Sequence, residues 1–169
     1  MTIKVGDTLP DATVREFIEV EGNGCSVGPN TFQVADLARD KRIVIFGLPG
    51  AFTPTCSAKH VPGYLERYDA LKAAGVDEIW CVSVNDAFVM GAWGRDQRSG
   101  GKVRMIADGA GEFTKKLGLD VDLSAGGMGL RSRRYSMLVD NGVVKSLNLE
   151  APGKFEVSDA ATMLRQVAG

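Results

Sequence analysis

The sequence predicts an α/β fold in which a mixed central sheet is flanked by helices. Strongly apolar runs alternate with helical segments between residues 42 and 117, and an Asn-Gly pair then separates two further strands. At 169 residues, without a linker-like stretch, the chain is long enough for one compact domain with a full hydrophobic core. We therefore expect a single domain over residues 1–169.

The first strand-helix-strand unit lies between residues 42 and 84. Residues 42–48 (RIVIFGL) and 78–84 (EIWCVSV) are β-branched and aromatic without alternation, which is typical of central strands buried on both faces. The segment between them predicts a helix that ends at Gly75, a good C-terminal cap. Its apolar residues recur at three- and four-residue spacing: Tyr64, Leu65, Tyr68 and Leu71.

A second helix and a weaker strand follow. Asn85-Asp86 can cap the helix. Its expected apolar stripe consists of Phe88, Val89, Ala92 and Trp93. Residues 102–106 then favour a strand, and residues 111–117 favour a short helix that ends at Gly118.

The last part of the chain predicts a hairpin and a terminal helix. Residues 135–139 and 143–149 favour strands, and Asn141-Gly142 between them is the strongest short signal for a tight hairpin. A final helix begins at Ser158. Strand-helix-strand units followed by a hairpin imply a mixed sheet between helices.

The composition excludes several classes of protein. The 20 Lys and Arg residues nearly balance the 21 Asp and Glu residues, so we expect no attraction to nucleic acid or to an anionic membrane. The N-terminal residues have no apolar core of signal-peptide type, and the longest apolar run, residues 43–58, is interrupted by Gly and Pro. We therefore expect a protein of the cytoplasm.

The three cysteines are too few and too widely spaced for a disulfide framework. With a single histidine, Cys25, Cys56 and Cys81 form no zinc set of recognisable spacing, so we expect no metal site. Each cysteine is then a reactive thiol or a buried apolar residue. Cys25 lies in a turn-like segment (EGNGCSVGPN), where we expect an exposed residue without a role.

The segment from Leu48 to Cys56 (LPGAFTPTC) joins a buried strand to a helix, at the sheet edge where open α/β proteins bind ligands. Thr53 is a good N-cap and Pro54 fits the first helical position, so Cys56 falls in the first turn. The unpaired N–H groups and the positive dipole end of that turn favour the thiolate, the form that attacks. Alternatively, Cys56 is only a small apolar residue beside an ordinary helix start.

A longer pattern favours the reactive thiol. The spacing of Pro49, Thr53 and Cys56, P-x-x-x-T-x-x-C, resembles the active-site signature of peroxiredoxins, and the surrounding GLPGAFTPTCSAKHVPGYLE resembles their atypical type II, type-five-like subfamily. The resemblance extends over nearly the whole chain, through VGDTLPDATV, GVDEIWCVSVNDAFVMGAWGRDQ, VRMIADGAGEFTKKLGL, GLRSRRYSMLVDNGVV and LNLE. It implies a thioredoxin-like fold and a thiol-dependent peroxidase that reduces hydrogen peroxide and organic hydroperoxides.

The resemblance also implies the site residues. Cys56 corresponds to the peroxidatic cysteine and Thr53 to the residue that hydrogen-bonds the sulfur or the peroxide. Pro49 shields the pocket, and Arg134, which precedes Tyr135 at the start of a late strand, contacts sulfur and peroxide. A fixed guanidinium can contact both groups, whereas lysine offers a point charge.

The implied reaction converts Cys56 to a sulfenic acid, which a second thiol then restores. No metal and no organic cofactor is needed for the peroxide step. The resemblance implies glutaredoxin, glutathione or thioredoxin as the reductant, and a non-covalent homodimer as the assembly.

Three further residues near this set, Arg131, Arg133 and His60, have alternative interpretations. An isolated run such as Arg131-Ser-Arg133-Arg134 is more often surface charge, and we expect Arg131 and Arg133 on the loop before the strand, as support or surface. His60 lies four residues after Cys56 and faces the same side of a regular helix. It could act as a base, but we expect a polar residue that lines or flanks the pocket.

Pro62 should kink the helix at the same turn.

Cys81 is the family-supported candidate for a resolving cysteine. Plant-like type II peroxiredoxins carry a cysteine in the same C-x-S-V-N-D setting, where it is held to form a disulfide with the peroxidatic one. Cys81 lies mid-strand, however, and a disulfide needs Cα atoms within about 7 Å, so the first helical turn would have to unwind. The alternative is a buried core cysteine, and we predict an enzyme without an obligatory internal disulfide, in which an external thiol attacks the Cys56 sulfenic acid directly.

Other functions remain open at this point. A peroxide-sensing signalling protein or a thiol-dependent binding protein would use the same oxidisable cysteine. A disulfide oxidoreductase is disfavoured, because Cys56 has no partner at C-x-x-C spacing.

Overall fold

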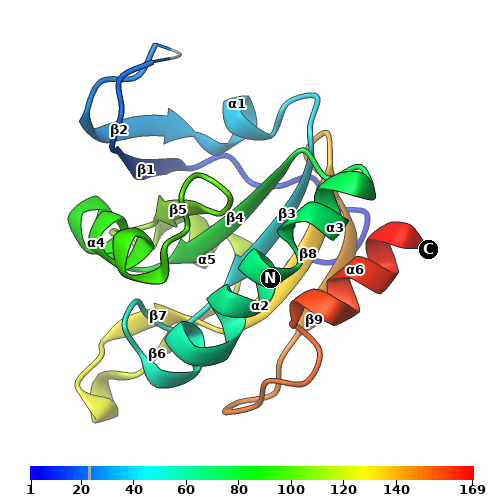
Figure 1. Cartoon of the computed structure of the whole chain (residues 1–169). Coiled ribbons are helices and arrows are strands. Elements are labelled where there is room, and N and C mark those ends of the chain that lie inside the picture. The colour runs from blue at the N-terminus through cyan, green and yellow to red at the C-terminus, as the bar shows by residue number, and fades with distance from the viewer. Residues whose placement is uncertain (23) are drawn as a thin grey trace.

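The computed structural model describes residues 1–22 and 24–169 and has an α/β architecture around one mixed sheet (Figure 1). The sheet has seven strands in the order β2-β1-β5-β4-β3-β8-β9. β3, β4 and β5 pair in parallel, whereas the other pairs are antiparallel, as predicted for a mixed sheet. The strands are β1 (Thr13–Ile18), β2 (Gly28–Gln33), β3 (Arg42–Gly47), β4 (Glu78–Ser83), β5 (Arg104–Ala107), β8 (Tyr135–Asp140) and β9 (Val143–Leu149).

Helices cover both faces of this sheet. Alternate residues of β3 enter different apolar clusters, since successive side chains of a strand point to opposite faces. Val44 and Phe46 pack with α2, α3, α4 and α6, whereas Ile43 and Ile45 pack with α1 and α5. The helices are α1 (Val34–Ala38), α2 (Val61–Glu66), α3 (Tyr68–Ala73), α4 (Ala87–Gln97), α5 (Glu112–Leu117) and α6 (Ala160–Ala168), with a π-helical turn η1 (Cys56–His60) and a 3-10 turn η2 (Ser124–Gly126).

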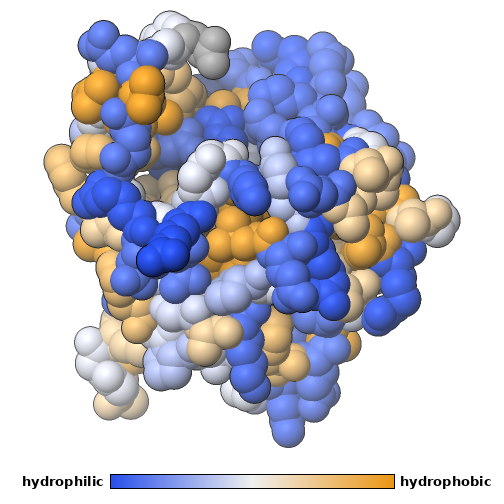
Figure 2. Space-filling view, viewed as in Figure 1, coloured by the Kyte–Doolittle hydropathy of each residue, from blue (hydrophilic) through white to orange (hydrophobic). Residues whose placement is uncertain are grey.

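The surface over α2, α3 and α6 is largely polar, with some apolar areas. These helices lie on the face of the sheet turned to the viewer in Figure 1, and Figure 2 shows that face as largely hydrophilic, with hydrophobic areas near its centre, at its upper left and at its right. The amphipathic helices therefore direct their apolar sides toward the sheet, as Ala160, Met163 and Val167 of α6 do. Among residues 1–22 and 24–169, no helix has the length and apolar character needed to cross a bilayer.

Two sequence patterns are confirmed at the level of single elements. The runs around residues 42–48 and 78–84 form the parallel neighbours β3 and β4. Asn141 and Gly142 have φ values of 45° and 80° and turn β8 into β9, in the left-handed geometry that a two-residue hairpin requires.

The expected apolar stripe of α4 is confirmed at Trp93 but wrong in phase at Phe88. Phe88 is 65% exposed, and the buried residues are Ala87, Met90, Trp93 and Gly94. The N-cap fixes this phase, because the Asp86 side chain accepts the Val89 amide and thereby places Phe88 on the outer side of the first turn.

Other differences concern short elements. The sequence patterns did not predict β1, β2 or α1, nor the two-stranded sheet of β6 (Asp120–Asp122) and β7 (Leu130–Ser132). Arg131 therefore lies in a strand and not on a loop, although Arg133 does lie between β7 and β8. Cys25 is partly buried instead of exposed, beside Asn23, which is outside the described residues.

Candidate active site

The site lies at the carboxyl end of β3, where the loop 48–53 leads into a helix. Three contacts from other parts of the chain hold this loop. The Leu48 amide donates to the Val82 carbonyl at 3.3 Å, and the Ala51 amide donates to Asn85 Oδ1 at 3.0 Å. Arg131 donates from Nη1 to the Pro49 carbonyl at 3.2 Å. The loop thus has a fixed shape before any substrate binds.

The helix begins as the sequence predicts, with Thr53 before it and Pro54 at its first position. The Ser57 amide donates to the Thr53 carbonyl at 3.0 Å, which closes the first turn around Cys56. The Thr53 hydroxyl donates to the Gly50 carbonyl at 2.7 Å. Because a hydroxyl has one hydrogen, the remaining lone pairs of Thr53 can only accept a hydrogen bond from a bound group.

Cys56 and His60 lie at the two ends of the π-helical turn η1. The Val61 amide donates to the Cys56 carbonyl, five residues back, and so widens the turn. Pro62, which has no N–H to continue a regular ladder, follows directly, and this is the irregularity that its position predicted. The side chains of Cys56 and His60 are fully buried, at 0% exposure.

Arg134 joins these two side chains from across the chain. It lies immediately before β8, and its Nη2 donates to Cys56 Sγ at 3.2 Å. Its Nη1 lies 2.9 Å from His60 Nδ1, and its guanidinium carbon lies 5.8 Å from the centre of the Phe155 ring. His60 and Phe155 therefore hold the positive charge of Arg134 against the sulfur.

The contacts of His60 fix its protonation state. Arg134 can only donate, so Nδ1 of His60 accepts, and Nε2 carries the hydrogen that bonds the Ser158 carbonyl at 3.1 Å. Burial, followed by the positive charge of Arg134, lowers the pKa of His60 to about 3. His60 is neutral at physiological pH and positions the guanidinium instead of serving as a base for Cys56.

A buried carboxylate organises the segment on the far side of His60. Glu150 accepts the amides of Glu156, Val157 and Ser158 at 2.8 to 3.0 Å, and also the Ser158 hydroxyl at 2.7 Å. Burial alone would raise the pKa of Glu150, but these hydrogen bonds outweigh it and hold the pKa below its usual range. The carboxylate thereby fixes the Ser158 carbonyl that His60 binds.

Cys81 lies in β4, opposite Phe46 of β3 and Met105 of β5, and is fully buried. It shares one apolar cluster with Cys56, so the two cysteines lie on the same side of the sheet. Burial raises the pKa of the Cys81 thiol well above its usual range, and a charge on Cys56 raises it further, although Arg134 opposes both. Cys81 is therefore a poor nucleophile in this conformation.

The structure brings Cys56, His60 and Arg134 together, with Thr53 and Pro49 on the adjoining loop. Sequence reasoning missed Glu150, gave Asn85 only a place in a helix cap and Ser158 only the start of a helix, and left Arg131 as support or surface. Asn85, Arg131, Glu150 and Ser158 act through contacts to segments far along the chain, which no local pattern signals. Within residues 1–22 and 24–169, no group of three His, Cys, Asp or Glu side chains could hold a metal ion.

The chain is similar to known redoxin-family proteins in both sequence and structure. Residues 4–164 match the Redoxin family. Peroxiredoxin-2B of Arabidopsis thaliana is 48% identical over 163 residues, which cover 96% of this chain and 97% of that protein. The crystal structure of reduced Prx3 from Vibrio vulnificus in complex with hydrogen peroxide is 50% identical with a TM-score of 0.90, over 98% of this chain and 99% of that one.

A crystal structure from Burkholderia cenocepacia, of a protein proposed to be a thioredoxin reductase, is 66% identical with a TM-score of 0.97, over 98% of each chain. The cysteine spacing of the present chain does not support dithiol exchange, because Cys56 is followed by serine, alanine and lysine where a C-x-x-C pair would have its second cysteine.

Proposed function

The chain belongs to the redoxin family as a peroxiredoxin, a thiol-dependent peroxidase with a thioredoxin-like fold, and from this premise we propose that Cys56 is the sulfur that reduces the peroxide. The observation that carries the assignment is the 3.2 Å contact between Arg134 Nη2 and Cys56 Sγ at the start of a helix. Identity to Peroxiredoxin-2B is 48%, against 37% to peroxiredoxin 5 of Alvinella pompejana, so the type II label fits this chain better than the type-five-like one.

The first step is a two-electron reduction of the peroxide. The Cys56 thiolate attacks the terminal oxygen, so an S–O bond forms as the O–O bond breaks. The sulfur becomes a sulfenic acid, and the departing oxygen leaves as hydroxide or alkoxide and takes a proton from solvent. Two electrons pass from sulfur to oxygen, and no other oxidant or reductant takes part in this step.

Arg134 and Thr53 serve the transition state of that step. Arg134 stabilises the thiolate and the negative charge that grows on the departing oxygen. The Thr53 hydroxyl, whose hydrogen is bound to the Gly50 carbonyl, accepts the peroxide O–H and so orients it. Pro49 shields the same pocket from water. His60 holds Arg134 in place from the opposite side.

The second step restores the sulfur with an external thiol. A thiolate of glutathione, glutaredoxin or thioredoxin attacks the sulfenic acid, which releases water and leaves a mixed disulfide that a second thiol cleaves. The buried, weakly acidic thiol of Cys81 supports this assignment, because such a thiol attacks slowly.

We also propose a cytoplasmic location, which fits an enzyme that depends on a thiol reductant, because that compartment keeps thiols reduced.

We further propose a non-covalent homodimer, as the family resemblance implies. Phe52 and Phe88, with 54% and 65% of their surface accessible, are large apolar side chains that such an interface would remove from water.

The test of the assignment is peroxide consumption by purified protein with glutathione, or with a glutaredoxin or thioredoxin system. We expect turnover to be abolished in Cys56→Ser and retained in Cys25→Ser, a matched loss of one thiol outside the site. Turnover that survives in Cys56→Ser refutes the role of Cys56.

The resolving step has its own test. Mass spectrometry after one equivalent of peroxide, without added thiol, should show oxidised Cys56 and no bond between Cys56 and Cys81. Stoichiometric linkage of these two residues, together with loss of turnover in Cys81→Ser, makes Cys81 the resolving cysteine instead.

A further inference from the structure

A cavity of about 360 Å³ adjoins the catalytic residues. Three segments that lie at the same end of the sheet in Figure 1 line it: the loop before Cys56, the β6–β7–β8 region, and the loop that follows β9. Pro49, Thr55 and Arg134 are among its lining residues, and Arg134 links the cavity to the sulfur through its 3.2 Å contact with Cys56 Sγ. Hydrogen peroxide, with two oxygen atoms, needs less than twice the roughly 30 Å³ that a water molecule occupies in the liquid, so most of the cavity is available to something larger.

One wall of this cavity is apolar. Val121 and Leu123 contribute from the β6 side, and Pro152 and Phe155 contribute from the loop after β9. Phe155 also packs against His60, with ring centres 4.9 Å apart, so this wall is continuous with the support of Arg134. A hydrocarbon substituent on the reacting peroxide would be removed from water here, which favours its binding.

The cavity also carries positive charge. Besides Arg134, which contacts the sulfur, Arg133 and Lys154 line it. Within residues 1–22 and 24–169, the ion pairs shorter than 4.0 Å include neither Arg133 nor Lys154. The acidic residue that lines the cavity, Glu150, directs its carboxylate to the amides of residues 156–158 and, in the part of the chain that the structure describes, forms no ion pair with Arg133 or Lys154. The three cations of the cavity therefore outnumber one carboxylate that is bound elsewhere.

We propose that this cavity binds an organic hydroperoxide whose apolar chain carries a carboxylate, with the chain against Leu123 and Phe155 and the carboxylate at Arg133 and Lys154. The inference rests on the proposed reaction at Cys56. The bonds that change are the same as for hydrogen peroxide, and the departing oxygen leaves as the alkoxide of a hydroxy acid. A neutral hydroperoxide of equal length would use the apolar wall but gain nothing from the two cations.

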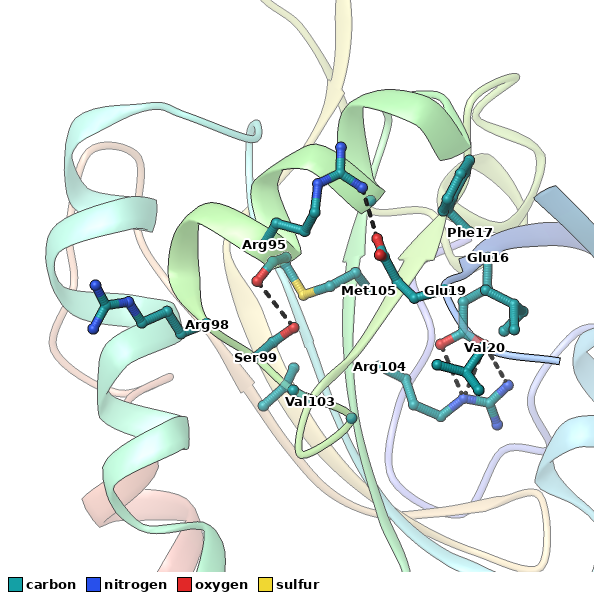
Figure 3. A pocket seen from close by; sticks show the side chains of 15 residues that line it. Glu16, Phe17, Glu19, Val20, Arg95, Arg98, Ser99, Val103, Arg104 and Met105 are labelled. Carbon is teal, nitrogen blue, oxygen red and sulfur yellow. Dashed lines mark hydrogen bonds and ion pairs between the residues drawn. The ribbon is translucent and has the colours of Figure 1, made fainter. Parts of the chain in front are cut away.

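A larger cavity elsewhere does not support a comparable inference. It measures about 680 Å³ and lies between β1, α4 and β5 (Figure 3). Two of its arginines are already paired, Arg95 with Glu19 at 2.6 Å and Arg104 with Glu16 at 2.7 Å. It contains none of the residues that contact Cys56.

The experiment compares the hydroperoxide of linoleic acid with that of methyl linoleate, both below their micelle concentrations. The second-order rate constant for oxidation of Cys56 is measured by quenched-flow mass spectrometry at low salt, and each value is divided by the value for hydrogen peroxide. We expect the acid to react about tenfold faster than the ester, a preference equivalent to about 1.4 kcal/mol. Raising the ionic strength should reduce the preference.

The preference should fall to about one in the double variant Arg133→Gln/Lys154→Gln. The double variant Arg15→Gln/Lys145→Gln removes the same charge from exposed positions away from the cavity and should keep it. Equal rates for acid and ester in the unmodified protein, or a preference that survives in Arg133→Gln/Lys154→Gln, overturn the carboxylate site. If hydrogen peroxide also fails to oxidise Cys56, the proposed function itself is wrong.

Discussion

The depressed pKa of His60 makes a quantitative prediction about acid stability. In the unfolded chain a histidine has a pKa of 6.5, whereas in the folded protein the pKa of His60 is about 3. Between these two pH values the unfolded state binds a proton at His60 and the folded state does not. The stabilisation that neutral His60 gives to the folded state is therefore fully present above pH 6.5 and is lost as the pH falls toward 3. Each pH unit costs about 1.4 kcal/mol within that window.

The perturbation is His60→Gln, which cannot titrate but keeps a donor for the Ser158 carbonyl. Between pH 7 and pH 4.5, protonation of His60 should cost the unmodified protein about 2.5 kcal/mol that the variant does not lose. Most other groups titrate equally in both proteins, so the difference between the two isolates His60.

Urea unfolding at pH 7, 6, 5 and 4.5 measures this difference directly. We expect the unmodified protein to be the more stable at pH 7 and to lose that advantage steadily toward pH 4.5. A stability difference that is independent of pH would refute the reasoning, because His60 would then accept a proton in the folded state as readily as in the unfolded one.

Three further predictions test the surroundings of Cys56. Arg134→Gln should slow sulfur oxidation by hydrogen peroxide by about two to three orders of magnitude, since it removes a charged donor from the transition state, with circular dichroism unchanged; an equal second-order rate would exclude that role. Glu150→Gln should lower the unfolding free energy at pH 7 by about 1–3 kcal/mol, because charge-assisted bonds to the segment ending at Ser158 weaken; an unchanged urea midpoint would count against this stabilising role of Glu150. Cys81→Ser should keep glutathione-dependent turnover, and a loss of turnover with an intact fold would reinstate Cys81 as the resolving cysteine.

The sequence predicts the parts of this molecule whose signals are local. The uniform burial of β3 and β4 shows in their unbroken apolar runs, and Asn141-Gly142 specifies the hairpin through its own backbone preferences. β2 alternates between partly buried and exposed residues and begins with Gly-Pro, so its sequence resembles a loop. β6 and β7 have three residues each, too few for a periodicity to be recognised.

The site also has a part that the sequence reveals and a part that only the folded structure reveals. Cys56, Thr53 and Pro49 belong to one run of sequence, so their association is visible before folding. The contact of His60 with Ser158 spans 98 positions, and that of Arg131 with Pro49 spans 82. The neutrality of His60 in particular depends on tertiary burial beside Arg134, which a spacing of four residues cannot reveal.

The complete burial of Cys56 has a consequence for the step that restores its sulfur. A peroxide needs to bring only its two reacting oxygen atoms to the sulfur, whereas a thiol reductant must form a covalent bond to a sulfur that is 0% exposed. We therefore expect recycling to use a minor population in which the turn has opened, with an observed rate scaled by that population. The bond from Trp93 Nε1 to Ser57 Oγ, at 3.0 Å, is one contact between that turn and α4 that opening must strain or break. We expect the opening of this five-residue turn, and not the chemistry at oxygen, to limit turnover at saturating peroxide.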